Sequence, residues 1–460
     1  MKNMSLAAIA AACNGTYIGD EALLTKEVSS IVIDSRKVEK DSLFIAIKGA
    51  RVDGHDFIPK VMEKGALCAL SEKDLGGVPY PYILVEECKP AMKAIAEYYR
   101  RSLDIKVVGI SGSVGKTSTK EMIASVLKQK YNVLKTVGNF NNEIGLPLTI
   151  FNIREEHEIA VLEMGISGFG EMTRLARMAR PDICVITNIG FVHLENLKDR
   201  DGVLKAKTEM MQYMNPEGSV IFNGNDDKLF SYKPENGVQP IYFGMGDHFT
   251  YHAENIDNQG LRGTTATFIT PESTFSAHIS IPGEHMVHNA MAGIAVGRAL
   301  GLTDKEIIAG IEALNPLAGR NHLIETPSFT IIDDCYNANP ISMKASLDVL
   351  SKSDTRTVAI LGDMFELGDD EKPMHYDVGR HAAEVGIQVL IAIGNMAQDI
   401  AFGADDMHKK HHMKIYYFTT KNEFFAAMDH VLKHNDTILV KASHGMEFSE
   451  IVDVLEKKIK

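Results

Sequence analysis

Short apolar runs alternate with amphipathic stretches through the middle of the chain. From residue 104 the runs KVVGIS, IAVLEMG, ICVITNIG and SVIFN have the composition of buried strands, and helical spacing appears between them at 171–180 and 203–214. Strands that alternate with helices are typical of a mostly parallel, doubly wound sheet. The pattern then becomes β-rich and Thr-rich from Phe243 to about His278, before a Gly-punctuated helix, PGEHMVHNAMAGIAVGRALGL.

A second α/β block begins near Leu317. Its predicted strands are FTIID, TVAILGD, QVLIAIG, KIYYF and TILVKAS, with helices between them and a last helix over 448–458. The first hundred residues are mixed, with short strands predicted at 31–33 and 43–47 and a helix at 92–101. We therefore predict an α/β protein of three domains: a small mixed N-terminal domain (1–103), a central doubly wound domain (104–316) and a C-terminal Rossmann-like domain (317–460). The length of 460 residues agrees, at about 150 residues per domain.

Composition narrows the class of protein. Lys and Arg number 48 against 61 Asp and Glu, so the formal net charge is −13, and a hydrophobic fraction of 45% is enough for a large core. This acidity argues against nucleic acid as a main partner but leaves room for phosphorylated small molecules, which need only a local positive site. The five scattered cysteines show no CxxC spacing, which favours a reduced, cytoplasmic compartment. No apolar run approaches the roughly 20 residues of a membrane span.

The N-terminal stretch MKNMSLAAIAAACNG allows two interpretations. A Lys followed by an Ala-rich run could be a short signal peptide. Alternatively it is a first helix, with Ser5 as its N-cap and Gly15 just past its end. We favour the helix.

The strongest chemical signal is a glycine-rich segment between an apolar strand and an amphipathic helix. Such a loop lets backbone N–H groups at a helix N-terminus approach phosphate, and its Lys and Thr can serve the β/γ-phosphates and Mg²⁺. The general P-loop has a further Gly at the position of Ile110, so this is the shorter GxxGKT form. The predicted phosphate-binding residues are Gly112, Ser113, Val114, Gly115, Lys116, Thr117 and Ser118.

Two further residues follow predicted strands of the same sheet. Glu163 ends IAVLE and His193 comes after ICVITNIG. Because ligands of open α/β sheets bind at the carboxyl ends of the strands, both residues are candidate metal ligands. A lone His is more often structural, so that alternative stays open for His193. Together these residues indicate an ATP-using or nucleotide-hydrolysing enzyme.

Several stretches together resemble the Mur ligase family, over all three predicted domains. They are ISGSVGKTSTKEM, TVGNFNNEIGLPLT, VLEMGISGFGEM, PDICVITNIGFVHLENL, DDCYNANPISMKAS, LGDMFELG and ILVKASHGMEFSEIV, with IDSRKVEKDSLFIAIKGARVDGHDFI at the N-terminus. GNFNNEIGLPLT and YNANPISMKA are most similar to the member that adds D-alanyl-D-alanine. The resemblance implies that ATP phosphorylates the carboxylate of UDP-N-acetylmuramoyl-tripeptide (UDP-MurNAc-tripeptide), and that the amine of D-Ala-D-Ala attacks the acyl phosphate in peptidoglycan precursor synthesis. It also implies a monomer.

The resemblance assigns roles around the nucleotide. The family carbamylates one lysine to hold a second Mg²⁺, and in GVLKAKTEMM the matching position is Lys207 rather than Lys205. Without the resemblance, Lys207 would be an ordinary solvated lysine. Asn289 matches an adenine contact, although Met286 replaces the Asn that usually accompanies it. The expected phosphate and ribose contacts from the third domain are Arg320 and Asp334.

Substrate-binding residues are implied in the same way. On the UDP-substrate side they are Ser35, Arg36, Asn139, Asn141 and Asn142, although turn formation is an alternative role for the three asparagines. On the acceptor side they are Tyr336, Asn337, Asn339 and Ser443. His444 stands where the family more often has Arg, and neutral His cannot form a bidentate cationic clamp.

Other interpretations remain at this point. A sister Mur ligase or a folylpolyglutamate-type ligase would share the ATP site and differ in its acceptor. A nucleotide-binding relative without catalysis is a third possibility. The sequence does not decide whether the third peptide residue of the substrate is diaminopimelate or lysine. The run HKKHHMK at 408–414 could suggest a metal site, but its interleaved lysines favour a solvated loop.

Overall fold

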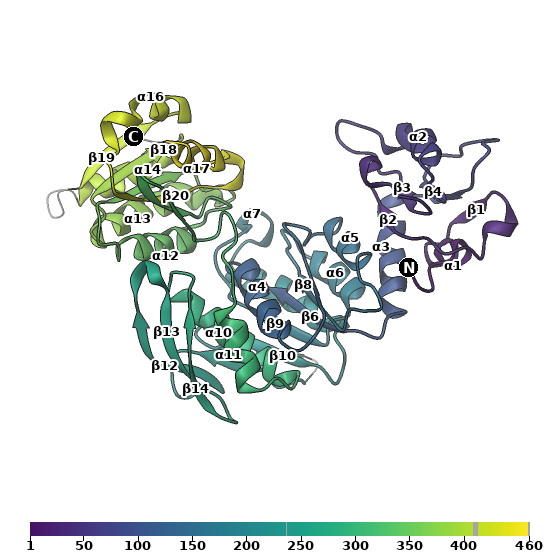
Figure 1. The fold of residues 1–460 in the computed structure, drawn as a ribbon, viewed down its shortest axis with the longest axis horizontal. Helices are drawn as coiled ribbons and strands as arrows, with labels where there is room; N and C mark the ends of the chain where they lie inside the picture. The colour runs from purple at the N-terminus through teal and green to yellow at the C-terminus, as the bar shows by residue number, and fades with distance from the viewer. Residues whose placement is uncertain (236, 408–412, 459–460) are drawn as a thin grey trace.

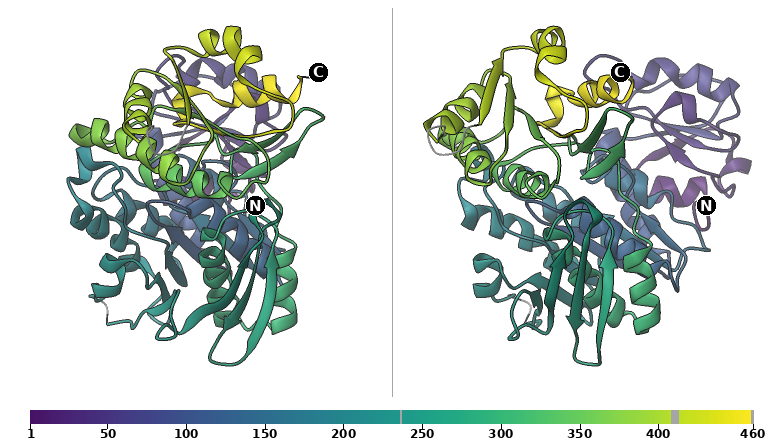
Figure 2. Two further views of the ribbon diagram at one scale, coloured as in Figure 1. Left: turned by 90° about the vertical axis from the view of Figure 1, so that its left-hand side faces the viewer. Right: turned by 60° about the vertical axis from the view of Figure 1, so that its left-hand side comes forward.

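The computed structural model describes residues 1–235, 237–407 and 413–458, and within these ranges it confirms the predicted three-domain α/β architecture. The strands form three sheets that follow one another along the chain (Figure 1). The first and third domains both lie over the central one and on different sides of it (Figure 2). Each sheet lies within one of the predicted ranges 1–103, 104–316 and 317–460, whose boundaries remain a prediction. Residues 408–412 of the HKKHHMK run lie outside the described residues.

The first sheet has the order β1-β5-β4-β3-β2, with β1 antiparallel and the other pairs parallel. The expected N-terminal helix is present as α1 (Leu6–Ala12), and the Ser5 hydroxyl caps it by accepting a hydrogen bond from the Ala8 N–H. The other elements are β1 (Thr16–Ile18), β2 (Ile31–Val32), β3 (Leu43–Ile45), α2 (Ile58–Glu63), β4 (Cys68–Ser71), β5 (Tyr82–Leu84) and α3 (Cys88–Arg101).

The central sheet has the order β14-β13-β12-β11-β10-β9-β6-β8-β7, parallel from β7 to β12 and antiparallel across β12, β13 and β14. Along β6, Val107 enters one buried cluster while Val108 and Ile110 enter another, as the two faces of a pleated strand require. The strands are β6 (Lys106–Ser111), β7 (Val133–Lys135), β8 (Ile159–Glu163), β9 (Ile183–Ile186), β10 (Ser219–Asn223), β11 (Ile241–Gly244), β12 (Tyr251–Asn258), β13 (Thr264–Ile269) and β14 (Thr274–Ile279).

Helices cover both faces of the central sheet. The helix predicted over 203–214 is α-helical only to Thr208 and continues as a 3₁₀ segment, Glu209–Tyr213. There the Glu209 carboxylate accepts hydrogen bonds from the backbone N–H groups of Gly170 and Thr173 at the start of α6. Glu209 thus provides partners for the free N–H groups of that helix end. The helices are α4 (Lys116–Leu127), α5 (Gly145–Ile150), α6 (Glu171–Ala179), α7 (Leu194–Leu197), α8 (Arg200–Thr208), α9 (Asp227–Ser231), α10 (His285–Ala299) and α11 (Asp304–Glu312).

The third sheet has the order β15-β16-β20-β17-β18-β19, parallel except for the edge strand β15, which the hydrophobic pattern does not indicate. Its strands are β15 (His322–Glu325), β16 (Phe329–Asp333), β17 (Thr357–Gly362), β18 (Val389–Ile393), β19 (Lys414–Phe418) and β20 (Asp436–Lys441). Its helices are α12 (Pro340–Leu350), α13 (Glu371–Glu384), α14 (Ala397–Asp406), α16 (Lys421–Val431) and α17 (Ser449–Glu456).

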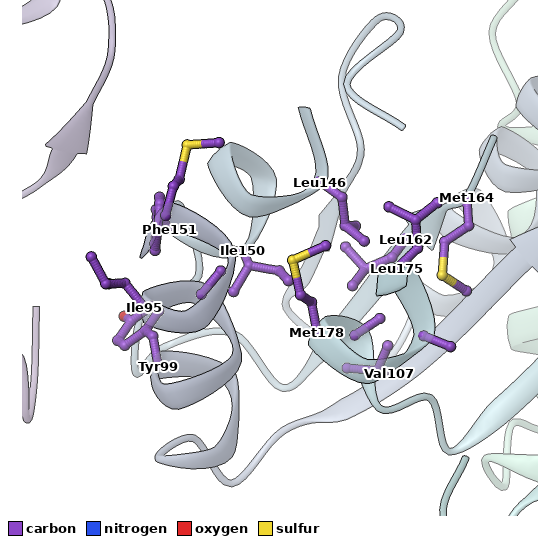
Figure 3. Packing of buried hydrophobic residues seen from close by; sticks show 14 of the residues in the cluster. Ile95, Tyr99, Val107, Leu146, Ile150, Phe151, Leu162, Met164, Leu175 and Met178 are labelled. Atoms are coloured by element: carbon purple, nitrogen blue, oxygen red, sulfur yellow. The ribbon is translucent and has the colours of Figure 1, made fainter. Parts of the chain in front are cut away.

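Helix α3 joins the first domain to the second through a shared core. Ile95 and Tyr99 on α3 belong to the same buried cluster as Ile150 and Phe151 around α5 (Figure 3). The Tyr99 hydroxyl also donates a hydrogen bond to the Ile153 carbonyl at 2.6 Å. This helix therefore fixes the first sheet on the central domain.

Candidate functional site

The predicted phosphate loop lies between β6 and α4. Helix α4 begins at Lys116, so Lys116, Thr117 and Ser118 form its first turn and its free N–H groups point toward the loop. Gly112 has φ +150°, and a Cβ there would lie 1.9 Å from Thr187 Oγ1. Lys116 Nζ donates to the carbonyls of Gly112 (2.8 Å) and Ser113 (3.4 Å). The loop thus has the shape and the cation of an anion site.

Two polar residues that the sequence reasoning missed hold this loop. Asn188 accepts a hydrogen bond from the Val114 N–H at 2.9 Å and donates one to the Val114 carbonyl at 3.0 Å. Thr187 Oγ1 donates to the same carbonyl at 2.6 Å. Both residues directly follow β9, and that position at the carboxyl edge of the sheet is the signal that could have indicated them.

Glu163 lies beside the loop, as its place at the end of β8 predicts. Its side chain is buried, and its Oε2 accepts a hydrogen bond from the Thr117 hydroxyl at 3.0 Å. Its Oε1 accepts one from Asn141 Nδ2 at 2.7 Å. A carboxylate next to a hydroxyl is a pair of hard oxygen ligands of the kind that Mg²⁺ prefers, so these two residues fit that ion.

His193 lines the same cleft from the start of α7, with φ +52°. Its Nδ1 lies 2.9 Å from Oε2 of Glu366, a residue of the third domain, so the contact spans two domains. Burial lowers the pKa of the imidazole, while Glu366 acts in the opposite direction. Within 1–235, 237–407 and 413–458, no three His, Cys, Asp or Glu side chains gather as a ready metal site.

Lys207, on α8, is fully buried instead of solvated. Burial lowers the pKa of its amine well below the ordinary value, and the positive charge of Lys116 lowers it further. In the described part of the chain its Nζ has no hydrogen bond or ion pair. It does not line the cleft directly. An uncharged lysine amine is a nucleophile, which is the state that reaction with CO₂ requires.

The third domain contributes the opposite wall of a cleft of about 520 Å³. Arg320 Nη2 donates to Thr117 Oγ1 at 3.3 Å, and its guanidinium lies 4.0 Å from the centroid of the Tyr336 ring. Asp334 accepts hydrogen bonds from Ser346 (2.6 Å) and from the buried Lys441, a partner that the sequence did not indicate. Arg320 thus connects the phosphate loop to the third domain.

The four asparagines predicted to contact the UDP substrate or adenine all line the cleft, but some of their side chains are already engaged in contacts within the protein. Asn139, Asn141 and Asn142 all line the cleft, and Asn141 contacts Glu163. Asn142 Oδ1 instead accepts from the N–H groups of Ile144 and Gly145, which is the turn-forming role held open for these residues. Asn289 lines the cleft while its amide contacts Thr119 Oγ1 (2.8 Å) and Met286 Sδ (3.2 Å).

The expected acceptor residues lie near one another, with different access to the cleft. Tyr336, Asn337 and Asn339 line it, although Asn339 also caps α12 by accepting from the Ser342 N–H. Ser443 is buried behind it and accepts a hydrogen bond from the Phe365 N–H at 2.8 Å. His444 lies against Tyr336, with ring centroids 5.4 Å apart.

The structure does not bring Ser35 and Arg36 to this cleft. They lie in the first domain, in a short 3₁₀ segment (Ser35–Lys37), and are absent from the lining of the cleft. The exposed Arg36 guanidinium pairs with both oxygens of Asp34, and that contact lowers the pKa of the Asp34 carboxyl to about 2. Any ligand that they share with the cleft must span the two domains.

A phosphate loop on a doubly wound sheet that faces a second α/β domain defines a nucleotide-using class of enzyme. Three family models match successive parts of this chain: the Mur ligase family catalytic domain (27–102), the Mur ligase middle domain (110–297) and the Mur ligase glutamate ligase domain (319–444). The chain belongs to the Mur ligase family, which confirms the resemblance seen in the sequence.

Several curated relatives of nearly equal length share one name within that family. The UDP-N-acetylmuramoyl-tripeptide–D-alanyl-D-alanine ligase of Bacillus subtilis is 37% identical over 438 residues, which cover 94% of each chain. The crystal structure of MurF from Acinetobacter baumannii has a TM-score of 0.89 at 30% identity over 99% of both chains. MurF ligase from Thermotoga maritima in complex with ADP has a TM-score of 0.81 at 28% identity, covering 93% of this chain and 97% of that one.

Proposed function

We propose that this chain is the ATP-dependent ligase that joins D-alanyl-D-alanine to UDP-MurNAc-tripeptide. The observation that carries the proposal is the cleft itself. There the phosphate loop with Lys116 faces Arg320 and Tyr336 of the third domain across a single cavity. The name shared by relatives of nearly equal length supports this choice of substrates. The product would serve peptidoglycan synthesis, and through it cell shape and division.

The residues around the loop suit the first step, activation of a carboxylate. A carboxylate is a poor electrophile, and transfer of the γ-phosphoryl group of ATP converts it to an acyl phosphate. Lys116, Arg320 and the free N–H groups of α4 provide positive charge for the transferring group. Asn289 and Asp334 would contact the base and the ribose.

The second step needs the amine of the dipeptide near the acyl carbon. Tyr336, Asn337, Asn339 and Ser443 would orient the dipeptide from the third domain. The amine attacks the acyl carbon, inorganic phosphate leaves, and an amide bond forms. Ser35 and Arg36 would hold the uridine diphosphate end, while Asn139, Asn141 and Asn142 hold the acyl end. Closure of the domains would exclude water from the acyl phosphate.

Magnesium fits the oxygen ligands present. Thr117 and Glu163 would hold one ion, and His193 with carbamylated Lys207 would hold another. Bound Mg²⁺ neutralises the charge of the phosphates. The unpaired, buried amine of Lys207 supports carbamylation, because a carbamate would give this position the anionic oxygen ligand that an amine lacks. We place the reaction in the cytoplasm, carried out by a monomer. No helix among the described residues is long and apolar enough to cross a bilayer.

Phosphate release tests the proposal. Purified chain, ATP, Mg²⁺ and UDP-MurNAc-tripeptide should release phosphate with D-Ala-D-Ala and should not do so with a single diamino acid. Turnover with the single amino acid and not with the dipeptide would identify a sister ligase. Tight ATP binding without turnover for any acceptor would identify an inactive relative. Lys116→Ala should abolish release, while Lys128→Ala, an exposed position at the end of the same helix, should not.

A further inference from the structure

Lys120 is a buried lysine beside the catalytic cleft to which the proposed reaction assigns no role. It lies on α4, one turn after Lys116, and only 1% of its surface is exposed. A fully buried ammonium is stable only when it is paired. Lys116 Nζ points at loop carbonyls, whereas Lys120 Nζ lies 3.6 Å from Oε2 of Glu163. The two lysines of this helix therefore face different partners.

Four side chains of alternating charge run from β7 to the cleft. Lys135 pairs with Glu121, the other carboxylate oxygen of Glu121 lies 3.3 Å from Lys120 Nζ, and Lys120 in turn pairs with Glu163. Two positive and two negative charges sum to zero. In this arrangement the buried charge of Glu163 is balanced by the protein itself.

That balance has a consequence for any cation that approaches Glu163. A divalent ion on this carboxylate would lie close to the fixed positive charge of Lys120, and like charges repel strongly in a poorly solvated site. Lys116 adds to the positive field. A nucleoside triphosphate carries enough negative charge to offset this repulsion, whereas a free cation arrives without any accompanying negative charge.

We propose that Lys120 is a positioning residue, a built-in counter-ion of Glu163 that prevents free divalent cations from binding this carboxylate, so that the cation enters only with the nucleotide. The inference rests on the role of Glu163 as a cation ligand proposed above. It assigns to Lys120 a control over the order of binding, separate from the phosphate contacts of Lys116.

Binding of Mn²⁺ to the nucleotide-free protein, followed by electron paramagnetic resonance, tests the inference. The Mn²⁺ site at Glu163 is identified by comparing two ADP-loaded proteins. It is the Mn²⁺ binding that the wild type shows and the Glu163→Gln variant lacks. Lys120→Met keeps the length of the side chain and removes its charge. We expect it to tighten nucleotide-free Mn²⁺ binding at this site by about tenfold or more, with a smaller change when ADP is present. The double variant Lys120→Met with Glu163→Gln should lose the gain.

A second variant predicts the opposite sign. Glu121→Gln removes the other carboxylate that faces Lys120, so Mn²⁺ should bind more weakly than in the wild type. Lys128→Met, exposed on the same helix, should match the wild type. If Lys120→Met does not fold, Glu121→Gln alone decides the question. Unchanged or reversed affinities in the two variants would overturn the inference. If Glu163→Gln removes no Mn²⁺ from the ADP-loaded protein, the proposed role of Glu163 fails instead, and turnover with D-Ala-D-Ala tests the overall function separately.

Discussion

At the scale of single residues, burial controls the chemistry of the cleft. Desolvation is the largest cause that lowers the pKa of Lys116, Lys207, His193 and His285, ahead of any charged neighbour. A buried base gives up its proton more easily because a low-dielectric site disfavours the charged form. Burial therefore weakens the hold of these groups on their protons, most of all at Lys207, which lies behind the lining of the cleft.

Lys207→Ala should reduce phosphate release by about a hundredfold or more, as expected when a preorganised charge is lost from an active site. Added formate or acetate should restore part of the activity, since a short carboxylate can replace the carbamate. Lys205→Ala, an exposed lysine two residues earlier, is the control and should remain active. Full activity of Lys207→Ala without added carboxylate would rule out carbamylation.

His288, whose Nε2 lies 3.0 Å from Asn225 Oδ1, should make the free energy of unfolding depend on pH. Burial lowers the pKa of its ring from 6.5 to about 4. Between these values the unfolded chain binds the proton and the folded one does not, so stability is complete above about pH 6.5 and falls as the pH decreases toward 4. Urea titrations at pH 7 and pH 4.5 measure how far the free energy of unfolding falls between the two pH values. This decrease should be roughly 1–2 kcal/mol smaller in His288→Gln than in the wild type. Equal losses in both proteins would contradict the shift.

Sequence reasoning located some of the groups that follow strands, such as Glu163, and missed Thr187 and Asn188 as well as the buried lysines that are paired with carboxylates of other elements. Glu163 and Thr117 could be predicted as neighbours because the edge of a parallel sheet brings a strand end and the next helix start together. Lys120 and Lys441 could not, because a lysine in a helix or strand is solvated unless a carboxylate from another element faces it. The role of Asn142 could not be predicted for a different reason. An asparagine at this position suits both a ligand contact and the turn that it forms in the structure.

At the scale of elements, the phosphate loop depends on a glycine that packs against the next strand end. Gly112→Ala should displace the loop, since its Cβ would collide with Thr187 in a backbone conformation that favours glycine. We expect nucleotide affinity to fall by at least about tenfold and stability by roughly 2 kcal/mol.

Gly138→Ala is the matched control for this prediction. Gly138 also has positive φ, at +57°, but nothing lies within 4 Å of a Cβ placed there. It carries the backbone strain without the collision. Calorimetric titration with ADP should therefore separate the two variants, and equal affinities in both would show that packing against Thr187 is unimportant.

The long strands and helices could be predicted because their hydrophobic periodicity is strong. Strand β15 escaped prediction because it lies half-buried at an antiparallel edge and has no continuous apolar run. Strand β7 has only three residues, Val133–Lys135, too few to show a period. The predicted helix over 203–214 changes to 3₁₀ geometry where Glu209 is held by α6, a tertiary contact that no local pattern contains.

At the scale of the whole molecule, the central and third domains meet through few polar contacts near the cleft. Arg320 connects Thr117 to Tyr336, and His193 contacts Glu366 across the gap. His193 meets Glu366 through Nδ1, so its Nε2 stays available to a metal while the contact between the domains orients the ring.

X-ray scattering should detect closure of the domains. The radius of gyration of the wild type should decrease when nucleotide and both substrates bind, because the ligands span the domains. Arg320→Ala should weaken this compaction and raise the KM for ATP. Arg320→Lys should not restore it, since lysine lacks the planar fork that stacks on Tyr336. An unchanged radius in the fully liganded wild type would rule out rigid-body closure.

The helix that joins the first two sheets has a consequence for how the protein unfolds. Because α3 packs into a hydrophobic cluster that contains residues of both domains, separating them would expose apolar surface that neither can cover alone. The third sheet has buried clusters of its own. Residues 1–316 are therefore expected to lose structure cooperatively, while the third domain can open and even unfold locally without disturbing the sheet that carries the phosphate loop.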